Sequence, residues 1–163
     1  MSSSPQDFMH RVFSSWFSIP ILLIFITFLT YASSFTNPFI WDDEQFIYKN
    51  QFVTSFSVSQ LFTQSTTSGA GVPSSYYRPL TSLSYAVDYA LWRDWTPGYH
   101  FTNTLAHALA GAVLFLFLRS LGLSRNSGAL VSLLFLLHPT QTEAVTYINS
   151  RGDSLYAFWT FIG

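Results

Sequence analysis

Three adjacent carboxylates, Asp42, Asp43 and Glu44, form the densest group of reactive side chains in the sequence. They follow Trp41, at the end of a long stretch without charged residues. Such crowding raises the cost of ionising all three groups, so at least one pKa should be perturbed. A carboxylate in this setting can act as a general base or orient a substrate hydroxyl. The alternative is a solvated loop end whose charges only keep the preceding helix from sliding into a membrane.

A second acidic centre lies in the segment HPTQTE, which contains His138 and Glu143. If both acidic segments follow helices that end on one membrane face, the topology brings them together. Four carboxylates could then hold a divalent cation, Mg²⁺ or Mn²⁺, if one takes part: Asp42, Asp43, Glu44 and Glu143. The spacing of the histidines predicts no metal site, and no other cofactor is expected.

Two arginines, Arg78 and Arg151, lie in segments predicted to be on the same face as the acidic motif. An arginine near the membrane plane is suited to binding a phosphate through two parallel hydrogen bonds. An ion pair with a lipid headgroup explains the same residues equally well. His138 is a further candidate for contacts with a phosphate.

Several classes of chemistry are excluded by composition. The chain of 163 residues has no cysteine, so disulfides, thiolate metal sites and cysteine nucleophiles are absent. It has no Gly-rich phosphate loop, no G-x-S-x-G and no H-E-x-x-H motif. A formal net charge of −1 lacks the basic footprint of a nucleic-acid-binding protein, so no nucleic-acid partner is expected.

The elements that must position these residues are apolar helices. Only 9% of the residues are charged and 49% are hydrophobic, against roughly 25% charged in an average soluble domain. Three stretches contain no Asp, Glu, Lys or Arg: 12–41, 95–118 and 126–142. The first two are long enough to cross a bilayer core, which needs roughly 20 residues. The sequence therefore predicts an all-α membrane protein.

Basic residues orient the predicted helices. Arg119 and Arg125 flank a short connection without acidic residues, and Arg11 precedes the first apolar run, so both regions are predicted to be cytoplasmic. The predicted organisation is a cytoplasmic N-terminus (1–16), transmembrane helix (17–35), outer loop (36–100), transmembrane helix (101–118), cytoplasmic loop (119–126), transmembrane helix (127–138), outer loop (139–153) and the start of a fourth, truncated helix (154–163).

Some of these elements have alternatives. The first run could be a signal peptide, but it exceeds the roughly 7 to 15 apolar residues of one. The third span is short and must be thinned or covered by neighbouring helices. The large outer loop carries two predicted interfacial helices, 52–62 and 79–92, separated by a flexible Ser/Thr/Gly-rich stretch. Five aromatic residues should lie at headgroup depth: Tyr76, Tyr77, Trp92, Trp95 and Tyr99.

Four segments occur in a recognisable order: FIWDDEQFIYKN, YYRPLTSLSYAVDYALW, PGYHFTNTLAHAL and HPTQTEAVTYINSRGDSL. Together they resemble the transmembrane and tetratricopeptide-repeat O-mannosyltransferase-like family and its bacterial relatives. The resemblance covers residues from about Phe35 onwards. It implies the N-terminal transmembrane helices of a GT-C fold, the class of integral membrane glycosyltransferases.

The resemblance also implies a reaction and roles for single residues. The activity would be transfer of a sugar, mannose, from a polyprenyl-phosphate donor to a hydroxyl of a protein or glycan acceptor on the outer face. The acidic motif would supply the catalytic base, with Asp43 the first choice, Asp42 the second and Glu143 contributing from the second loop. The membrane lipid, the lipid-linked sugar and the acceptor are the implied partners.

Two other functions are consistent with the residues. A transporter or flippase subunit for a lipid-linked sugar would also need charges on the outer face. A non-catalytic membrane anchor for C-terminal repeats would leave the acidic loop merely solvated. The chain is predicted to be the N-terminal part of a larger multi-pass protein, in the bacterial inner membrane or the endoplasmic reticulum membrane; the absence of an N-x-[ST] sequon does not decide between them.

Overall fold

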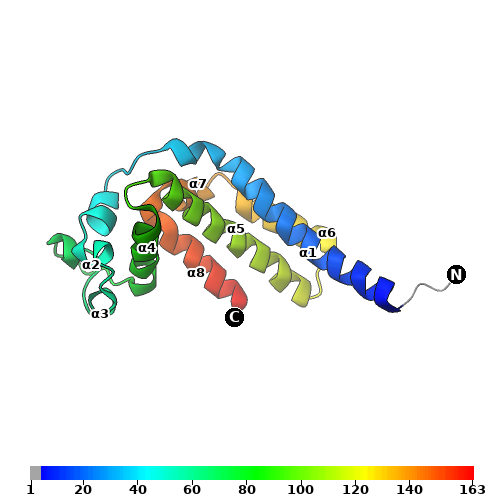
Figure 1. Cartoon of the computed structure of the whole chain (residues 1–163). Coiled ribbons are helices and arrows are strands. Elements are labelled where there is room, and N and C mark those ends of the chain that lie inside the picture. Colours follow the sequence, from blue (N-terminus) through cyan, green and yellow to red (C-terminus); the bar gives the residue numbers. More distant parts are fainter. Residues whose placement is uncertain (1–4) are drawn as a thin grey trace.

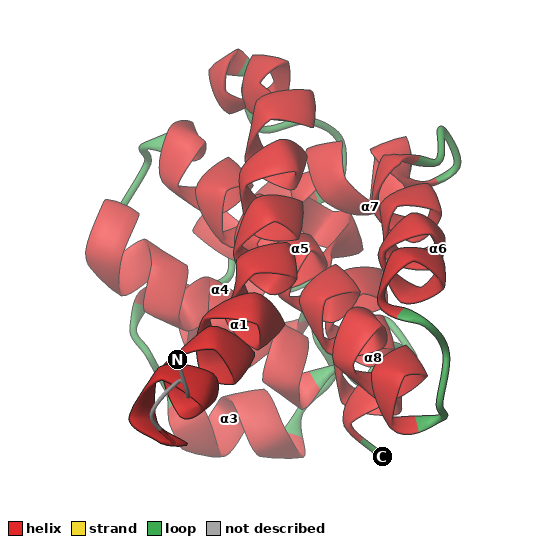
Figure 2. Cartoon of the chain, turned by 90° about the vertical axis from the view of Figure 1, so that its right-hand side faces the viewer, coloured by secondary structure: helices red, strands yellow, loops and turns green. Residues whose placement is uncertain are grey.

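The computed structural model describes the backbone of residues 5–163 and the side chains of residues 18–163. This part of the chain is helical and contains no strand. The helices α1 (Pro5–Thr30), α5 (Thr96–Ser120), α6 (Arg125–Leu137) and α8 (Arg151–Ile162) form a bundle (Figure 1). Figure 2 shows this bundle from its end, and α5 packs against the other three helices.

Shorter elements gather at one end of the bundle, where α1 and α6 finish and α5 and α8 begin (Figure 1). We call this the loop end. In chain order it contains η1 (Ala32–Thr36), η2 (Glu44–Tyr48), α2 (Gln51–Thr54), α3 (Val58–Thr63), η3 (Ser68–Ala70), α4 (Pro79–Trp92), α7 (Gln141–Thr146) and η4 (Ile148–Ser150). The two segments predicted as outer loops therefore lie at the same end of the bundle.

Local sequence signals explain where the helices begin and end. Pro79 and Pro97 occupy the first turns of α4 and α5, where a missing N–H costs nothing. The Ser124 hydroxyl accepts a hydrogen bond from the Ser127 N–H at the start of α6. Gly122, with φ 88°, lets the chain turn after α5. As a result α5 and α6 begin before the predicted spans. The predicted N-terminal segment 1–16 falls outside the described side chains.

Two apolar clusters hold the molecule together. The larger lies at the loop end and consists of Phe46, Ile47, Val53, Leu61, Tyr85, Ala86, Tyr99 and Ile148. The smaller lies in the bundle and consists of Leu23, Phe115 and Leu136. Next to it, Gly111 lets α5 approach α6 closely, since a Cβ atom there would lie 2.5 Å from the Leu136 side chain.

The surface of the bundle is apolar. By length and composition α5 is the one helix among the described residues that could cross a membrane by itself; Ser18–Thr30 and Arg125–Leu137 are shorter apolar segments. Large apolar side chains nevertheless project outward from α1 and α6 as well: Ile21, Leu22, Phe25, Leu29, Leu130 and Leu134 are each more than half exposed.

Helix α4 corresponds to the second predicted interfacial helix, and its position at a membrane stays a prediction. Its polar residues Thr81, Ser82 and Asp88 are buried, whereas Leu80 and Leu91 are 55% and 65% exposed. The apolar stripe thus faces outward, as a lipid-contacting helix requires, and the polar face packs inward. The reason is that Asp88 has a buried partner, described below.

Two further predictions at the loop end need correction. Tyr99 was expected at headgroup depth, but it is fully buried and its ring packs edge-on against Phe39. The Ser/Thr/Gly-rich stretch was expected to be flexible, yet it is tied down: the Asn50 amide donates to the Thr66 carbonyl at 2.7 Å, and Thr66 is buried. Tyr76, Tyr77 and Trp95 are exposed, as predicted.

Candidate functional site

The acidic motif, Asp42–Glu44, lies between a strained residue and a π-helix. Trp41 has φ 49°, in the left-handed region that bulky residues rarely adopt, and its ring packs edge-on against Tyr147, 5.6 Å away. In η2, the Lys49 N–H donates to the Glu44 carbonyl at 2.8 Å, the wide π-type turn. Such conformations persist only where the surroundings enforce them, and they cluster at functional sites.

Asp43 points into the protein and is fully buried. Its Oδ2 accepts a hydrogen bond from the Ile40 N–H at 2.9 Å, and its Oδ1 accepts one from the Asn149 N–H at 3.0 Å. Burial raises the pKa of Asp43 to about 6, and the Asp42 charge acts in the same direction against the two N–H groups and the more distant Arg151. Asp43 therefore fastens the motif to the second loop segment and titrates near neutral pH.

The other two carboxylates of the motif face outward. Asp42 is exposed, and its backbone N–H donates to the Tyr147 hydroxyl at 3.3 Å. Glu44 forms an ion pair with Lys49, whose ammonium lowers the pKa of Glu44. Asp42 is thus the carboxylate of the motif that is both exposed and without an ion-pair partner among the described residues. The adjacent residues Asp42 and Asp43 therefore point in different directions.

The second loop segment contacts the acidic motif through residues other than the predicted His138 and Glu143. Glu143, in α7, is exposed, and no hydrogen bond joins its carboxylate to Asp42 or Asp43 in the described part of the chain. His138 caps the end of α6 and is exposed, with Nδ1 2.8 Å from the Thr140 hydroxyl. The contacts that join the two segments come instead from Tyr147 and Asn149.

The arrangement does not assemble a metal site from the described side chains. No group of three or more Asp, Glu or His residues is placed to hold one ion within residues 18–163. The reason is geometric, because Asp43 turns inward and Glu44 pairs with Lys49. The use of a divalent metal by the protein stays a prediction.

Arg151 is fully buried at the start of α8. Its Nε donates to Asn103 Oδ1 at 2.6 Å, and one terminal nitrogen donates to Ser84 Oγ at 3.1 Å. The other terminal nitrogen forms an ion pair with Asp88. Burial raises the pKa of Asp88, and the Arg151 charge opposes that rise. The guanidinium therefore joins α4, α5 and α8, and the phosphate-binding role predicted for it stays a prediction.

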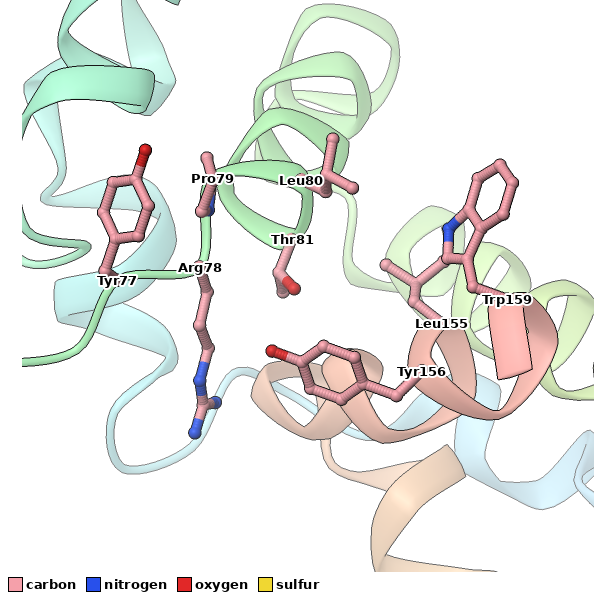
Figure 3. Close-up of a pocket in the computed structure, with 8 residues that line it drawn as sticks. All are labelled: Tyr77, Arg78, Pro79, Leu80, Thr81, Leu155, Tyr156 and Trp159. Atoms are coloured by element: carbon pink, nitrogen blue, oxygen red, sulfur yellow. The ribbon is translucent and has the colours of Figure 1, made fainter. Parts of the chain in front are cut away.

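Arg78 lies in a different setting, at the edge of a groove between α4 and α8 (Figure 3). The groove has a volume of about 140 Å³ and is mostly apolar, lined by Leu80 of α4 and by Leu155 and Trp159 of α8. Figure 3 shows the hydroxyl of Tyr156 pointing toward the Arg78 side of the groove. The Arg78 guanidinium stacks on the Tyr76 ring at 5.3 Å and forms no ion pair with a described residue.

Sequence reasoning missed the residues that connect these parts. Asp88 and Asn103 were passed over as members of predicted helices, and Tyr147 and Asn149 as loop residues. A signal for the first two was present, because polar side chains inside apolar helices need partners and mark candidate sites. For Tyr147 and Asn149 the interactions run mainly through a ring and a backbone N–H, which no sequence pattern reveals.

Comparison with known proteins shows what the chain is similar to. Mouse protein O-mannosyl-transferase TMTC3 is 40% identical over 79 residues, which are 48% of this chain and 8% of the relative. Drosophila melanogaster protein O-mannosyl-transferase Tmtc1 is 32% identical over 133 residues, 78% of this chain and 15% of the relative. The chain is homologous to the TMTC-family protein O-mannosyl-transferases. This confirms the resemblance inferred from the four sequence segments.

A third TMTC protein shows how far the similarity extends. Mouse protein O-mannosyl-transferase TMTC4 is 29% identical over 160 residues, 85% of this chain and 22% of the relative. The chain therefore spans about a fifth or less of the length of the TMTC relatives it matches. No family profile matches the chain, and no solved structure matches it. These relatives are named as protein O-mannosyl-transferases.

Proposed function

We propose that this chain forms the catalytic face of a GT-C mannosyltransferase embedded in a membrane. The enzyme would transfer mannose from a polyprenyl-phosphate carrier to a hydroxyl of a protein or glycan acceptor. The observation that carries the proposal is the divergent pair Asp42 and Asp43, in which a buried carboxylate holds an exposed one in place. Its support comes from the TMTC homologues, which are named as protein O-mannosyl-transferases.

The membrane part of the proposal rests on the surface of the bundle. Besides α5, the exposed faces of α1 and α6 carry large apolar side chains, for which lipid is the favourable solvent. The exposed apolar stripe of α4, with Leu80 and Leu91, extends this surface toward the loop end. We propose that α1, α5, α6 and α8 all cross the membrane and that the loop end faces outward, since Arg119 and Arg125 lie at the opposite end.

We place the donor in the groove beside Arg78. A lipid-linked sugar has an apolar tail and a charged phosphate, and the groove combines an apolar wall with one guanidinium at its edge. Its volume of about 140 Å³ is below the roughly 300–1,000 Å³ of a complete ligand pocket, so it would hold only the phosphate and the start of the tail. Arg78 would bind the phosphate and stabilise its charge as it leaves.

The acceptor hydroxyl would be activated by the acidic motif. Its oxygen attacks C1 of the mannose as the bond between C1 and the phosphate oxygen breaks, and this displacement inverts the configuration at C1. The proton of the hydroxyl passes to a carboxylate. Asp43 was the first choice for this base, but both of its oxygens accept backbone hydrogen bonds and it has no exposed surface. We therefore assign the base to Asp42, which is exposed, and a supporting role to Asp43.

The test compares single substitutions in the natural protein in membranes, with transfer of radiolabelled mannose from a polyprenyl-phosphate donor as the measurement. Asp42→Asn should lower the rate by roughly 10² to 10⁴-fold, the usual contribution of a positioned base. Asp153→Asn is the matched control, since Asp153 is an exposed aspartate at the start of α8, and it should leave the rate unchanged. Asp43→Asn is tested alongside. Small and equal losses of rate from Asp42→Asn and Asp43→Asn would favour a merely solvated loop. A larger loss from Asp43→Asn would return the role to Asp43.

A further inference from the structure

The buried ion pair between Arg151 and Asp88 lies behind the acidic motif, and a chain of hydrogen bonds connects the two. We propose that Arg151 is a positioning residue for this motif: anchored on Asp88 and Ser84, it orients Asn103, which in turn fixes the backbone segment that holds Asp42 and Asp43. The catalytic consequence rests on the proposed function; the structural consequence does not.

The first step is the orientation of the Asn103 side chain. Arg151 Nε donates to Asn103 Oδ1 at 2.6 Å, which commits that oxygen and directs the amide nitrogen the other way. The amide nitrogen then donates toward three backbone carbonyls, at 3.4 Å to Val145, 3.1 Å to Tyr147 and 3.2 Å to Ile148. Asn103 is fully buried, so no water replaces these bonds.

The second step is the backbone segment itself. Residues 145–148 are held from one side by Asn103 and from another by the Tyr85 hydroxyl, which donates to the Ile148 carbonyl at 2.9 Å. The Tyr147 hydroxyl of this segment accepts a hydrogen bond from the Asp42 N–H, and the next residue after the segment, Asn149, donates its N–H to Asp43. The position of both carboxylates is therefore set by a segment that Arg151 and Asn103 hold from behind.

The third step is the anchoring of Arg151. Its guanidinium stacks on the Tyr85 ring at 4.7 Å, and Ser84, Asp88 and Asn103 occupy its donors. Only arginine offers donors in a rigid planar fork that can satisfy three partners on two helices at once. A lysine would keep the charge but could not hold Asp88, Ser84 and Asn103 together.

The network also reaches Asp43 through its charge. The charged and titratable groups that act on Asp43 are Asp42 on its own segment, Tyr147 on the facing segment, Tyr85 on α4 and Arg151 on α8. Of these, Arg151 is the cation, and it lowers the pKa of Asp43 against the effect of burial. A change at Arg151 that removes this charge or moves the segment holding Asp43 should therefore shift the titration of Asp43.

The experiment separates positioning from folding with two variants. The double variant Asp88→Asn with Arg151→Gln removes both charges together, so no unpaired charge is left buried. Arg151→Lys keeps the positive charge but removes the planar set of guanidinium donors. The matched control is Arg125→Lys, because Arg125 is an exposed arginine that donates to Ser18.

The first readout needs no catalysis: the Asp43 carboxyl is titrated by carbon-13 NMR of the 163-residue chain in detergent, with its signal assigned from Asp43→Asn. The midpoint should lie near 6 in the unchanged chain, move upward in the double variant and stay in place in Arg125→Lys. A double variant that keeps its helical circular dichroism and an unchanged midpoint overturns the proposal.

The second readout is mannose transfer by the natural protein as a function of pH. Arg151→Lys should lower the rate about 10 to 10²-fold at unchanged donor KM, the cost of a small misplacement of catalytic groups. Unchanged transfer in Arg151→Lys would also contradict the proposal. If the unchanged protein does not transfer mannose, the proposed function fails. The NMR titration still tests the link between Arg151 and Asp43 in that case.

Discussion

The loop end adds a network of buried polar side chains to its apolar cluster, whereas the bundle relies more on apolar contacts. At the loop end, Asp43, Asn50, Asp88, Asn103 and Arg151 are all buried, and each has a hydrogen-bond partner. In the bundle the cluster around Leu23, Phe115 and Leu136 is apolar, and α5 meets α6 at a glycine. Directional bonds fix side chains to a fraction of an ångström, whereas apolar contacts mainly fix the distance between helices. The precise part of the molecule is therefore the part that carries the acidic motif.

The largest effect on stability is expected from breaking the buried ion pair on one side only. Arg151→Met leaves the Asp88 carboxylate buried without its cation, and removal of one partner of a buried pair costs about 3–5 kcal/mol. The measurement is the unfolding free energy in detergent. The double variant Asp88→Asn with Arg151→Met should recover a large part of the loss, and a single variant as stable as the unchanged chain would show that the pair is not buried.

The next effect concerns the pH dependence of stability. The folded chain raises the pKa of Asp43 to about 6 from its usual 3.8, so the folded state binds more protons than the unfolded state between these values. Stability from this group is therefore present below the unfolded pKa and is lost as the pH rises through about 6, by roughly 3 kcal/mol.

The measurement compares the unfolding free energies of the unchanged chain and Asp43→Asn at pH 4 and pH 7.5. The difference between the two chains should shift in favour of Asp43→Asn at the higher pH. Asp43→Asn also places an amide N–H₂ against the Ile40 or Asn149 N–H, which costs about 1–3 kcal/mol at both pH values. A difference that does not depend on pH would contradict the raised pKa.

A smaller effect is expected in the bundle. Gly111→Ala places a Cβ atom 2.5 Å from the side chain of Leu136, which is fully buried. Overpacking of this kind costs about 1–3 kcal/mol, and the better helix propensity of alanine returns up to about 1 kcal/mol. The thermal unfolding midpoint should fall, and Gly111→Ala combined with Leu136→Val should recover part of it. Gly71→Ala, where nothing lies within 4 Å, reports the effect of the mutation without a clash, although its φ of 71° adds local strain.

The smallest effect is expected at the exposed pair of the acidic motif. Glu44→Gln removes the ion pair with Lys49, but both side chains are well exposed. Exposed ion pairs contribute little because water and salt screen them. The unfolding midpoint should therefore be unchanged within error. A clear loss would mean that Glu44, like Asp43, belongs to the precise part of the loop end.

The acidic motif shows how far the sequence alone could lead. Crowding of three adjacent carboxylates predicted a perturbed pKa, and the pKa of Asp43 is raised, but chiefly by burial, with the Asp42 charge a smaller cause. The choice between Asp42 and Asp43 could not be made in advance, because the direction of each side chain depends on the turn at Trp41 and on η2. The role of Arg151 was equally hidden, since a lone arginine near an apolar segment does not show whether it faces a phosphate or a buried carboxylate.

The sequence by itself determined the helical class, the apolar character of the long helices, the meeting of two loop segments at one end and the family resemblance. These follow from local composition and from the order of the segments, which do not depend on packing. Only the tertiary structure decided that Asp43 turns inward, that Asp88 pairs with Arg151 and that Asn103 holds the 145–148 backbone. The physical reason is that each of these interactions joins residues more than 40 positions apart in the chain, and burial of a polar group is settled by the partner it meets.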